Sequence, residues 1–257
     1  MDLEFIKYEK SDRIARITFN RPEVMNALHE PCHAEMEKVL GDFLADDEIW
    51  VAILTGAGDK AFCAGNDLKW QAQKGTPKIP STGFASITNR FDMAKPVIAA
   101  VNGVALGGGF EIALSCDIIV ASETARFGLP EPRVGLMAAA GGVHRFPRQV
   151  PLKIAMGYML TGKHMSAAEA HRWGVVNEVV PPAGLMDAAT RWANEIAECS
   201  PLSVRASKRV SMENIHLSVA DAIKGGAPLE RELFRSEDAR EGPMAFAQKR
   251  KPNWKGR

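Results

Sequence analysis

The stretch from Pro96 to Leu114, PVIAAVNGVALGGGFEIAL, constrains the fold of this chain more than any other part of the sequence. Val97–Val101 is a continuous apolar run that begins after a proline and ends at Asn102-Gly103. Such a run is typical of a strand that is covered on both faces, as in parallel or mixed sheets. Three glycines and then good helix formers follow, so the stretch predicts a buried strand, a glycine-rich turn and the start of a helix.

The glycine run Gly107–Gly109 indicates a place where another molecule can reach the backbone. N–H groups at a helix start lack partners within the helix, and without side chains to shield them they favour a negative oxygen. Glu111 follows about one turn later, and N–H donors beside a carboxylate suit chemistry at a carbonyl group. A tight turn whose Glu111 only complements the helix dipole explains the pattern equally well. The run matches neither a P-loop nor the G-x-G-x-x-G spacing.

The whole chain has the length and composition of an ordinary globular protein. Its 257 residues are near the upper size of a single hydrophobic core, so one domain with an appendage is expected. A formal net charge of +1 argues against a nucleic-acid partner. The four cysteines form no C-x-x-C pair, and we find neither a signal-peptide layout nor an apolar run long enough to span a membrane. We therefore expect a soluble cytoplasmic protein with no membrane partner.

Hydrophobic periodicity predicts alternating strands and helices in the first third of the chain. Arg13–Phe19 alternates apolar and polar residues like a half-exposed strand, and Trp50–Leu54 reads as a buried one. Apolar residues at helical spacing from Leu28 to Phe43 predict an amphipathic helix between them, and this order indicates a parallel crossover. Trp70–Arg90 is polar and has no sustained period, so it predicts a long loop or lid that carries specificity.

Two motifs in this region match binding signatures only formally. His29–His33, HEPCH, fits the H-E-x-x-H zinc motif, but Pro31 belongs in a first helical turn and not in the helix interior where that motif works. Histidines on the surface at a helix start explain it better. Gly56–Ala61 fits G-x-G-x-x-A after a strand, but the following residues to Asp67 are poor helix formers, and a dinucleotide fold needs a helix there.

The second half of the chain continues with strands and then becomes helical. Asp117–Ala121 predicts a buried strand, and Glu131 follows between two prolines, a rigid position that most often is a solvated turn. Ser166–Glu169 is a capping box that begins a helix, and Val175–Val180 is the last predicted strand. From Ser200 onward we predict only helices, beginning at Pro201, after Ser236 and again at Pro243.

Five segments spread over nearly the whole length carry a specific pattern: NRPEVMNAL (Asn20–Leu28), AFCAGNDL (Ala61–Leu68), KPVIAAVNGVALGGGFEIALSCDIIVA (Lys95–Ala121), FGLPEPRVGL (Phe127–Leu136) and LTGKHMSAAEAHRWGVVNEVV (Leu160–Val180). Through them the chain resembles the enoyl-CoA hydratase/isomerase (crotonase) family. The resemblance implies an α/β fold, a crotonase-like spiral of ββα turns over residues 1–199 that holds the active site. It also implies a C-terminal helical region, residues 200–257, that assembles a homotrimer or a hexamer made of two trimers.

The resemblance also implies the site. The family binds acyl-CoA thioesters and stabilises the enolate formed at the thioester carbonyl. Its oxyanion hole corresponds to the backbone N–H groups of Asn66 and Gly108. Asn66 replaces a residue that is often alanine, which need not disable a main-chain contact. Its two glutamates correspond to Glu111, expected to activate water, and Glu131, expected to protonate the α-carbon. No metal or redox cofactor is expected, since coenzyme A is part of the substrate.

The expected coenzyme A contacts come from two regions of the chain. Val24, Ala64, Asp67 and Leu68 match segments that line the adenine and pantetheine path. Phe246 and Lys249 match a C-terminal element that reaches the nucleotide, on the same or a neighbouring subunit. A packed aromatic side chain and a solvated lysine at a helix end explain this last pair equally well.

The leading functional hypothesis is an enoyl-CoA hydratase, a lyase that adds water to the 2,3 double bond of 2-enoyl-CoA and gives 3-hydroxyacyl-CoA, as in fatty-acid β-oxidation. Two alternatives are a carnitinyl-CoA dehydratase, whose branch has a similar tail, and an enoyl-CoA isomerase, although pure isomerases commonly lack the first glutamate. A non-catalytic CoA-ester-binding or RNA-binding relative is a different class, against which both glutamates and the near-neutral charge speak. The acyl group cannot be read from the sequence.

Overall fold

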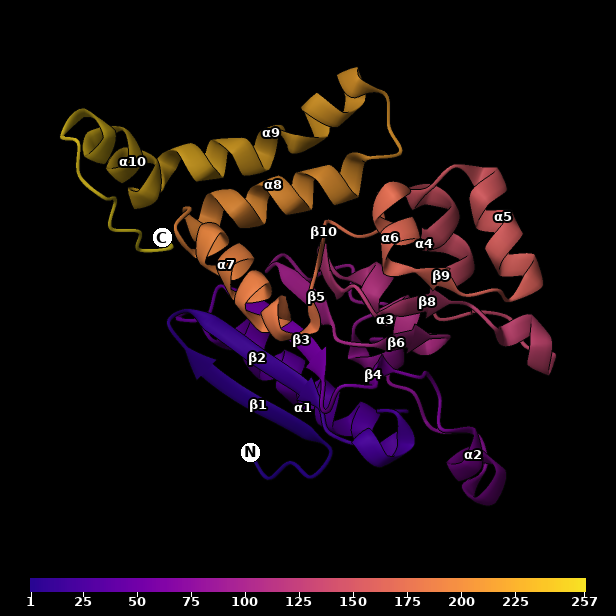
Figure 1. Cartoon of the computed structure of the whole chain (residues 1–257). Helices are drawn as coiled ribbons and strands as arrows, with labels where there is room; N and C mark the ends of the chain where they lie inside the picture. The colour runs from indigo at the N-terminus through magenta and orange to yellow at the C-terminus, as the bar shows by residue number, and fades with distance from the viewer.

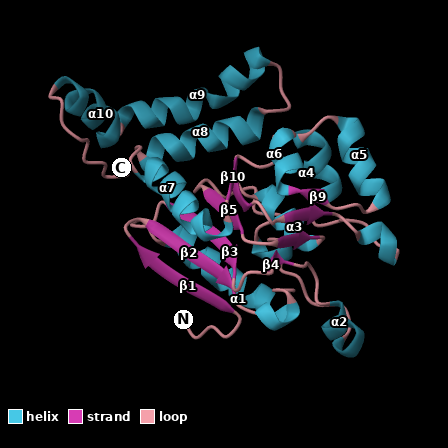
Figure 2. Ribbon diagram, in the orientation of Figure 1, coloured by secondary structure: helices cyan, strands magenta, loops and turns pink.

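The computed structural model describes residues 1–257, which form two sheets surrounded by helices (Figures 1 and 2). A six-stranded sheet has the order β1-β2-β3-β5-β7-β10, and a four-stranded sheet has the order β4-β6-β8-β9. All neighbouring strands are parallel except the pairs β1–β2 and β8–β9. The bounds are β1 Ile6–Ser11, β2 Ile14–Phe19, β3 Val51–Gly56, β4 Ala61–Cys63, β5 Val97–Val101, β6 Val104–Leu106, β7 Ile118–Ser122, β8 Arg126–Gly128, β9 Met165–Ser166 and β10 Glu178–Val180.

The two sheets are built by a repeated unit. Strands β3, β5 and β7 of the large sheet lead directly into β4, β6 and β8 of the small one, so each unit adds one strand to each sheet. A helix follows each unit in turn: α2 (Leu68–Lys74), α3 (Gly108–Ser115) and, after a short turn, α4 (Gly142–Gln149). The predicted spiral of ββα turns is therefore confirmed.

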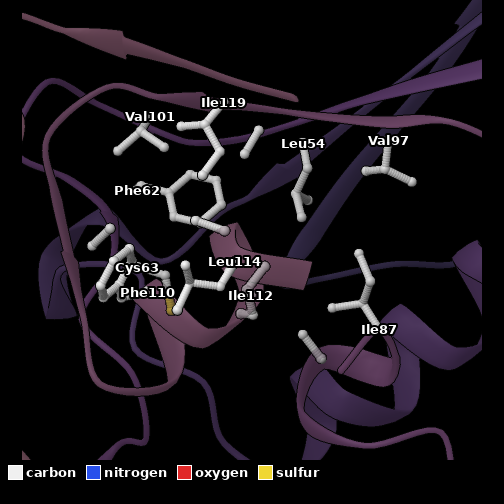
Figure 3. Close-up of a cluster of buried hydrophobic side chains, with 14 of the residues drawn as sticks. Leu54, Phe62, Cys63, Ile87, Val97, Val101, Phe110, Ile112, Leu114 and Ile119 are labelled. Carbon is white, nitrogen blue, oxygen red and sulfur yellow. The ribbon is translucent and has the colours of Figure 1, made fainter. Parts of the chain in front are cut away.

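Strand β5 shows why its sequence is apolar without interruption. Val97, Ala99 and Val101 belong to the main core of 42 buried residues, where Figure 3 shows Val101 near Phe62 and Val97 beyond Leu54. Ile98 and Ala100 belong instead to a second cluster of ten buried residues, between the sheet and α7 (Leu185–Ala197). Successive side chains of a strand point to opposite faces, so a strand covered on both faces needs apolar residues at every position.

The N-terminal elements differ from the prediction in two respects. Strand β1, which pairs antiparallel with β2, was not predicted because its exposed face breaks the apolar pattern. Strand β2 departs from a half-exposed strand at one residue: on its second face Arg16 is exposed and Thr18 half-buried, but Ile14 is buried in the cluster with α7. The predicted amphipathic helix is confirmed as α1 (Glu30–Ala45), which buries an apolar stripe: Cys32, Met36, Val39, Leu40 and Phe43.

The prediction of a loop or lid over Trp70–Arg90 is only partly right. Its first residues belong to α2, which begins where the Asp67 carboxylate accepts a hydrogen bond from the Trp70 N–H at 3.0 Å. Residues 83–88 are buried and include a short 3-10 turn, Phe84–Ser86. A side-chain cap and burial by distant elements stabilise this segment, and neither leaves a period in its sequence.

Several of the later helices begin where the sequence predicts. The capping box at Ser166 begins α6 (Ala167–Arg172), which follows α5 (Leu152–Thr161), and Ser200 caps α8 (Pro201–Asn214). The predicted restart at Pro243 is wrong, because α10 (Glu237–Ala247) continues through that proline. A proline removes one N–H donor from a helix but need not end it.

Two C-terminal helices extend away from the sheets. Helix α9 (Val219–Arg235) lies beside α8, and the pair projects from the body of the molecule (Figure 1). Gly226 is the one buried residue of α9. Large apolar side chains at this end are more than two-thirds exposed: Ile215, Val219, Ile223 and Phe234. No helix of the chain has the length and apolar character needed to cross a membrane.

Candidate active site

The glycine run Gly107–Gly109 forms the centre of the candidate site, where three different groups press on its backbone. A Cβ atom on the third glycine would lie 1.9 Å from the carbonyl oxygen of Cys63, and one on the second would lie 2.5 Å from Cε1 of Phe84. The first glycine has a φ of +54° and would bring a Cβ to 3.0 Å from Oε1 of Glu131. At Gly108 and Gly109, therefore, only glycine fits without displacing a neighbour.

Two backbone N–H groups are open at this turn. Gly65 has a φ of +92°, and a Cβ on it would lie 3.1 Å from the Gly108 nitrogen, so the loop after β4 lies against the start of α3. The Leu28 N–H donates to Gly65 O and the Asp67 N–H donates to Leu28 O, both at 2.8 Å, which holds Asn66 between two fixed peptides. The N–H groups of Asn66 and Gly108 donate to no group of the chain. Both are therefore available to an acceptor from outside the chain.

Glu111 lies in the first turn of α3 with only 3% of its surface exposed. Its Oε1 accepts a hydrogen bond from the Gly142 N–H at 2.8 Å. Burial raises the pKa of Glu111 to about 7, the Gly142 N–H opposes this rise, and the charge of Glu131 adds to it. Since a charged carboxylate is costly to bury, this group can take up and release a proton near neutral pH.

Glu131 follows β8 and is the first residue of a short 3-10 turn, Glu131–Val134. Its neighbours Pro130 and Pro132 restrict the backbone there, and its carboxyl lies against the glycine run. It is not the solvated turn residue that its neighbouring prolines suggest. Its Oε2 is buried and has no hydrogen-bond partner in the chain, and burial raises the pKa of Glu131. An oxygen without a partner inside a protein is costly unless a ligand binds it, so this carboxyl is suited to act on one.

The two glutamates are twenty residues apart in sequence, and the fold brings them close enough for the charge of Glu131 to raise the pKa of Glu111. Glu111 is on the helix that the glycines begin, and Glu131 contacts the first of those glycines. Two carboxyls that interact rarely ionise together, and one proton can be exchanged between them. With two open N–H donors beside them, the arrangement can stabilise an anionic oxygen while a proton is taken and another is given.

Comparison with known proteins shows the family of the chain. Residues 9–257 match the enoyl-CoA hydratase/isomerase family model. The chain belongs to the enoyl-CoA hydratase/isomerase family. Similar relatives include the carnitinyl-CoA dehydratases of Proteus mirabilis, 44% identical over 250 residues and 95% of each chain, and of Escherichia coli, 43% identical over 260 residues and 99% of each chain. The enoyl-CoA hydratase structure from Mycobacterium tuberculosis has a TM-score of 0.94 and 39% identity, covering 98% of this chain and 99% of that one.

The structure adds neighbours of the site that sequence reasoning about the family did not identify. The guanidinium of Arg145, on α4, donates from Nη2 to Thr88 O at 2.7 Å. Burial lowers the pKa of Arg145, and the charge of Glu111 opposes this. Phe84 packs on Gly108, and the Gly142 peptide binds Glu111. The one sequence feature that favours such close backbone packing is the run of small residues Ala138–Gly142 before α4.

The first group of residues expected to contact coenzyme A (Val24, Ala64, Asp67 and Leu68) lies close to the site. Val24 ends a short 3-10 turn, and the Ala64 N–H donates to the next residue, Met25, at 3.0 Å. Leu68 begins α2 and is 49% exposed. The Asp67 carboxylate is already occupied, because it pairs with Arg21 at 2.9 Å and caps α2. These residues shape one edge of the site through the loop that carries Asn66.

The second group of residues expected to contact coenzyme A, Phe246 and Lys249, does not lie near the site of the same chain. Phe246 is 87% exposed near the end of α10, and Lys249 follows it with a φ of +54°. Figure 1 shows α10 and α2 on opposite sides of the molecule. One chain therefore does not bring the two groups of expected coenzyme A residues together.

The expectation of surface histidines in the HEPCH motif is wrong. Pro31 is in the first turn of α1, as predicted, but His29 is 6% exposed and His33 is fully buried. The helix turns this face toward α2 and the Phe84 segment, which a sequence pattern cannot show. No group of three or more His, Cys, Asp or Glu side chains gathers in a way that could hold a metal ion. Cys63 is fully buried, and burial raises the pKa of its thiol to about 12.

Proposed function

We propose that this protein is a hydro-lyase that reversibly adds water to the 2,3 double bond of a 2-enoyl-CoA thioester, giving 3-hydroxyacyl-CoA. One observation carries the proposal: two buried carboxyls with raised pKa values meet at a glycine turn beside two open N–H donors. Relatives named carnitinyl-CoA dehydratase and neighbours named enoyl-CoA hydratase support the same reaction type. Both carboxyls would be superfluous in a relative that only binds CoA esters or RNA.

The thioester carbonyl is assigned to the donors of Asn66 and Gly108. Attack of water at the β-carbon places negative charge on the thioester oxygen, and two N–H groups held by fixed peptides stabilise that charge without reorganising. The helix that begins at Gly108 adds the positive end of its dipole. The side chain of Asn66 is not needed for this role, since the contact is a main-chain one.

The protons are assigned to the two glutamates. Glu111, held by the Gly142 N–H, takes a proton from the attacking water, and Glu131 gives one to the α-carbon. Dehydration reverses these roles. The balance is complete with water as the only co-reactant, so we propose that neither a metal nor a redox cofactor takes part and that coenzyme A enters as part of the substrate.

A second candidate is the dehydration of carnitinyl-CoA. Relatives with that name are 42–44% identical to this chain over 95–99% of its length. The same two carboxyls and donors serve that reaction, since it differs only in the acyl group. A pure isomerase is less well supported, because it does not require both glutamates.

We propose further that residues 1–199 form the catalytic core and residues 200–257 the oligomerisation region of a trimer or a hexamer. The apolar side chains exposed on and between α8 and α9 support this, since a patch of this kind usually contacts another subunit. Assembly would also let Phe246 and Lys249 of one subunit reach the coenzyme A bound to another. The cytoplasmic location remains a proposal, supported by four free cysteines.

The experiment measures the rate of hydration of a panel of 2-enoyl-CoA esters with short, long, branched and crotonobetainyl chains. Hydration is detected as the loss of the conjugated double bond. We expect hydration of at least one ester and a clear preference that selects between the two candidates. A Glu111→Gln, Glu131→Gln double variant is the matched control, because it preserves side-chain volume and removes both acid–base groups. The proposal would be refuted if the double variant hydrated an ester as fast as the wild type. It would also be refuted if the wild type hydrated no ester of the panel.

A further inference from the structure

A strained turn lies against the candidate oxyanion donor. Ala85 and Ser86 have φ values of +50° and +53°, in the left-handed region that residues with a side chain rarely adopt. Both are fully buried, and Phe84 before them is only 5% exposed. Two consecutive residues in this conformation persist only if their surroundings hold them, and such strain is found preferentially at functional sites.

His33 of α1 holds this turn. Its Nδ1 accepts a hydrogen bond from the Ala85 N–H at 3.1 Å, and its carbonyl oxygen accepts one from Ser86 Oγ at 3.4 Å. Its ring packs edge-to-face on Phe84, with 4.6 Å between ring centroids. The Phe84 N–H is held separately by Thr88 Oγ1 at 2.9 Å. His33 therefore contacts all three residues of the turn.

The imidazole is fitted to accept a hydrogen bond and not to exchange protons. An Nδ1 that accepts requires the neutral ring with its hydrogen on Nε2, which is buried and has no partner. Burial lowers the pKa of His33 to about 4, and the charge of His29 lowers it further while that of Glu30 opposes this. At neutral pH the ring therefore stays an acceptor.

The turn acts on the site through Phe84. A Cβ on Gly108 would lie 2.5 Å from Cε1 of Phe84, so the ring rests directly on the Cα of the residue that supplies one open N–H donor. We propose that His33 is a positioning residue: by holding the strained turn, it keeps Phe84 against Gly108 and fixes the direction of that N–H. This role rests on the proposed function, because it concerns the donor assigned to the thioester oxygen.

The first experiment compares His33→Leu with His33→Asn. Leucine fills much of the imidazole volume and accepts no hydrogen bond, whereas asparagine places a carboxamide oxygen about where Nδ1 lies. A donor fixed for the transition state acts on kcat, and a small displacement of such a group costs on the order of 10–100-fold. We therefore expect His33→Leu to lose about that factor in kcat with KM changed less than about threefold, and His33→Asn to recover most of it. Equal losses in both variants, or an equal effect on KM, would overturn the proposal.

A second pair of variants decides the matter if His33→Leu does not fold. His33→Gln carries its carboxamide further out, near the position of Nε2, so it should lose activity that His33→Asn keeps. Equal activity of these two would refute the acceptor role. If His33→Leu does fold, adding Ala85→Gly to it should restore part of the activity, since glycine adopts a positive φ without strain.

Amide hydrogen exchange tests the positioning without any substrate. The Ala85 N–H should be strongly protected in the wild type, remain protected in His33→Asn and exchange at least about tenfold faster in His33→Leu. Unchanged protection in the Leu variant contradicts the role of His33 even if the enzyme is active. If the wild type hydrated no ester of the panel, the proposed function would fail while this measurement still reported on the turn.

Discussion

Replacing Glu111 by glutamine should separate catalysis from stability. The glutamine oxygen can still accept the Gly142 N–H, so the contact at 2.8 Å need not be lost. The proton-transferring group disappears, and general acid–base catalysis contributes about 10²–10⁴-fold. We expect hydration to fall by a factor of that order while CoA-ester binding is kept.

The same change should make folding less sensitive to pH. The pKa of Glu111 rises from an ordinary 4.5 to about 7 on folding, because burial disfavours the charged form. The folded state therefore holds its proton more tightly than the unfolded state. The stability that this gives is complete below pH 4.5 and is lost as the pH rises through 7. The rise in the pKa of Glu111 from 4.5 to about 7 corresponds to about 3 kcal/mol in the free energy of unfolding.

Urea denaturation of both proteins at pH 4.5 and at pH 8.5 measures this effect. Titrations common to both proteins cancel, so the free energy of unfolding of Glu111→Gln minus that of the wild type should increase by about 3 kcal/mol between the two pH values. A difference that does not change with pH, or that changes in the opposite direction, would show that the carboxyl is not held protonated by the fold.

Isotope exchange tests the division of roles between the two glutamates. Under the proposed roles, exchange of the α-proton of a saturated acyl-CoA with deuterated water needs Glu131 and the N–H donors, and it needs no attack of water at the β-carbon. Glu111→Gln should therefore keep more of this exchange than Glu131→Gln. Equal exchange in both variants would contradict the assigned roles and leave the reaction type standing. Their losses in hydration should not add, because the two groups act as a unit.

Three further predictions concern pH, the donors and assembly. The hydration kcat/KM should rise with pH toward about 7 as Glu111 loses its proton, and a flat profile from pH 5 to pH 8 would contradict this. Asn66→Ala should keep hydration of a short neutral ester within about tenfold, since its contact is a main-chain one, whereas folded Gly108→Pro should lose at least about 10²-fold. Undiminished turnover by the proline variant would place the oxyanion hole elsewhere. Sedimentation should find a trimer or a hexamer, and a stable monomer at micromolar concentration would refute the assembly.

Much of the fold could be predicted because its signals are local. The apolar run of β5, the stripe of α1, the capping box at Ser166 and the serine caps of α8 and α10 are all written in a few consecutive residues. The polar strand β1 was missed, because its place is decided by its pairing with β2. The segment around Phe84 shows no period in its sequence for a similar reason, since its burial comes from α1 and α3.

A glycine turn and a carboxylate at one helix start can be predicted from the sequence, because they are neighbours in the chain. The pairing of Glu111 with Glu131 came only from the family resemblance, since no helical or strand period links residues twenty apart. Only the tertiary structure decided their environment: burial raises both pKa values, Gly142 binds one carboxyl, and His33 is a buried acceptor and not a surface residue. Proton affinity and donor direction depend on what surrounds a group in space, and distant segments supply those surroundings only after the chain has folded.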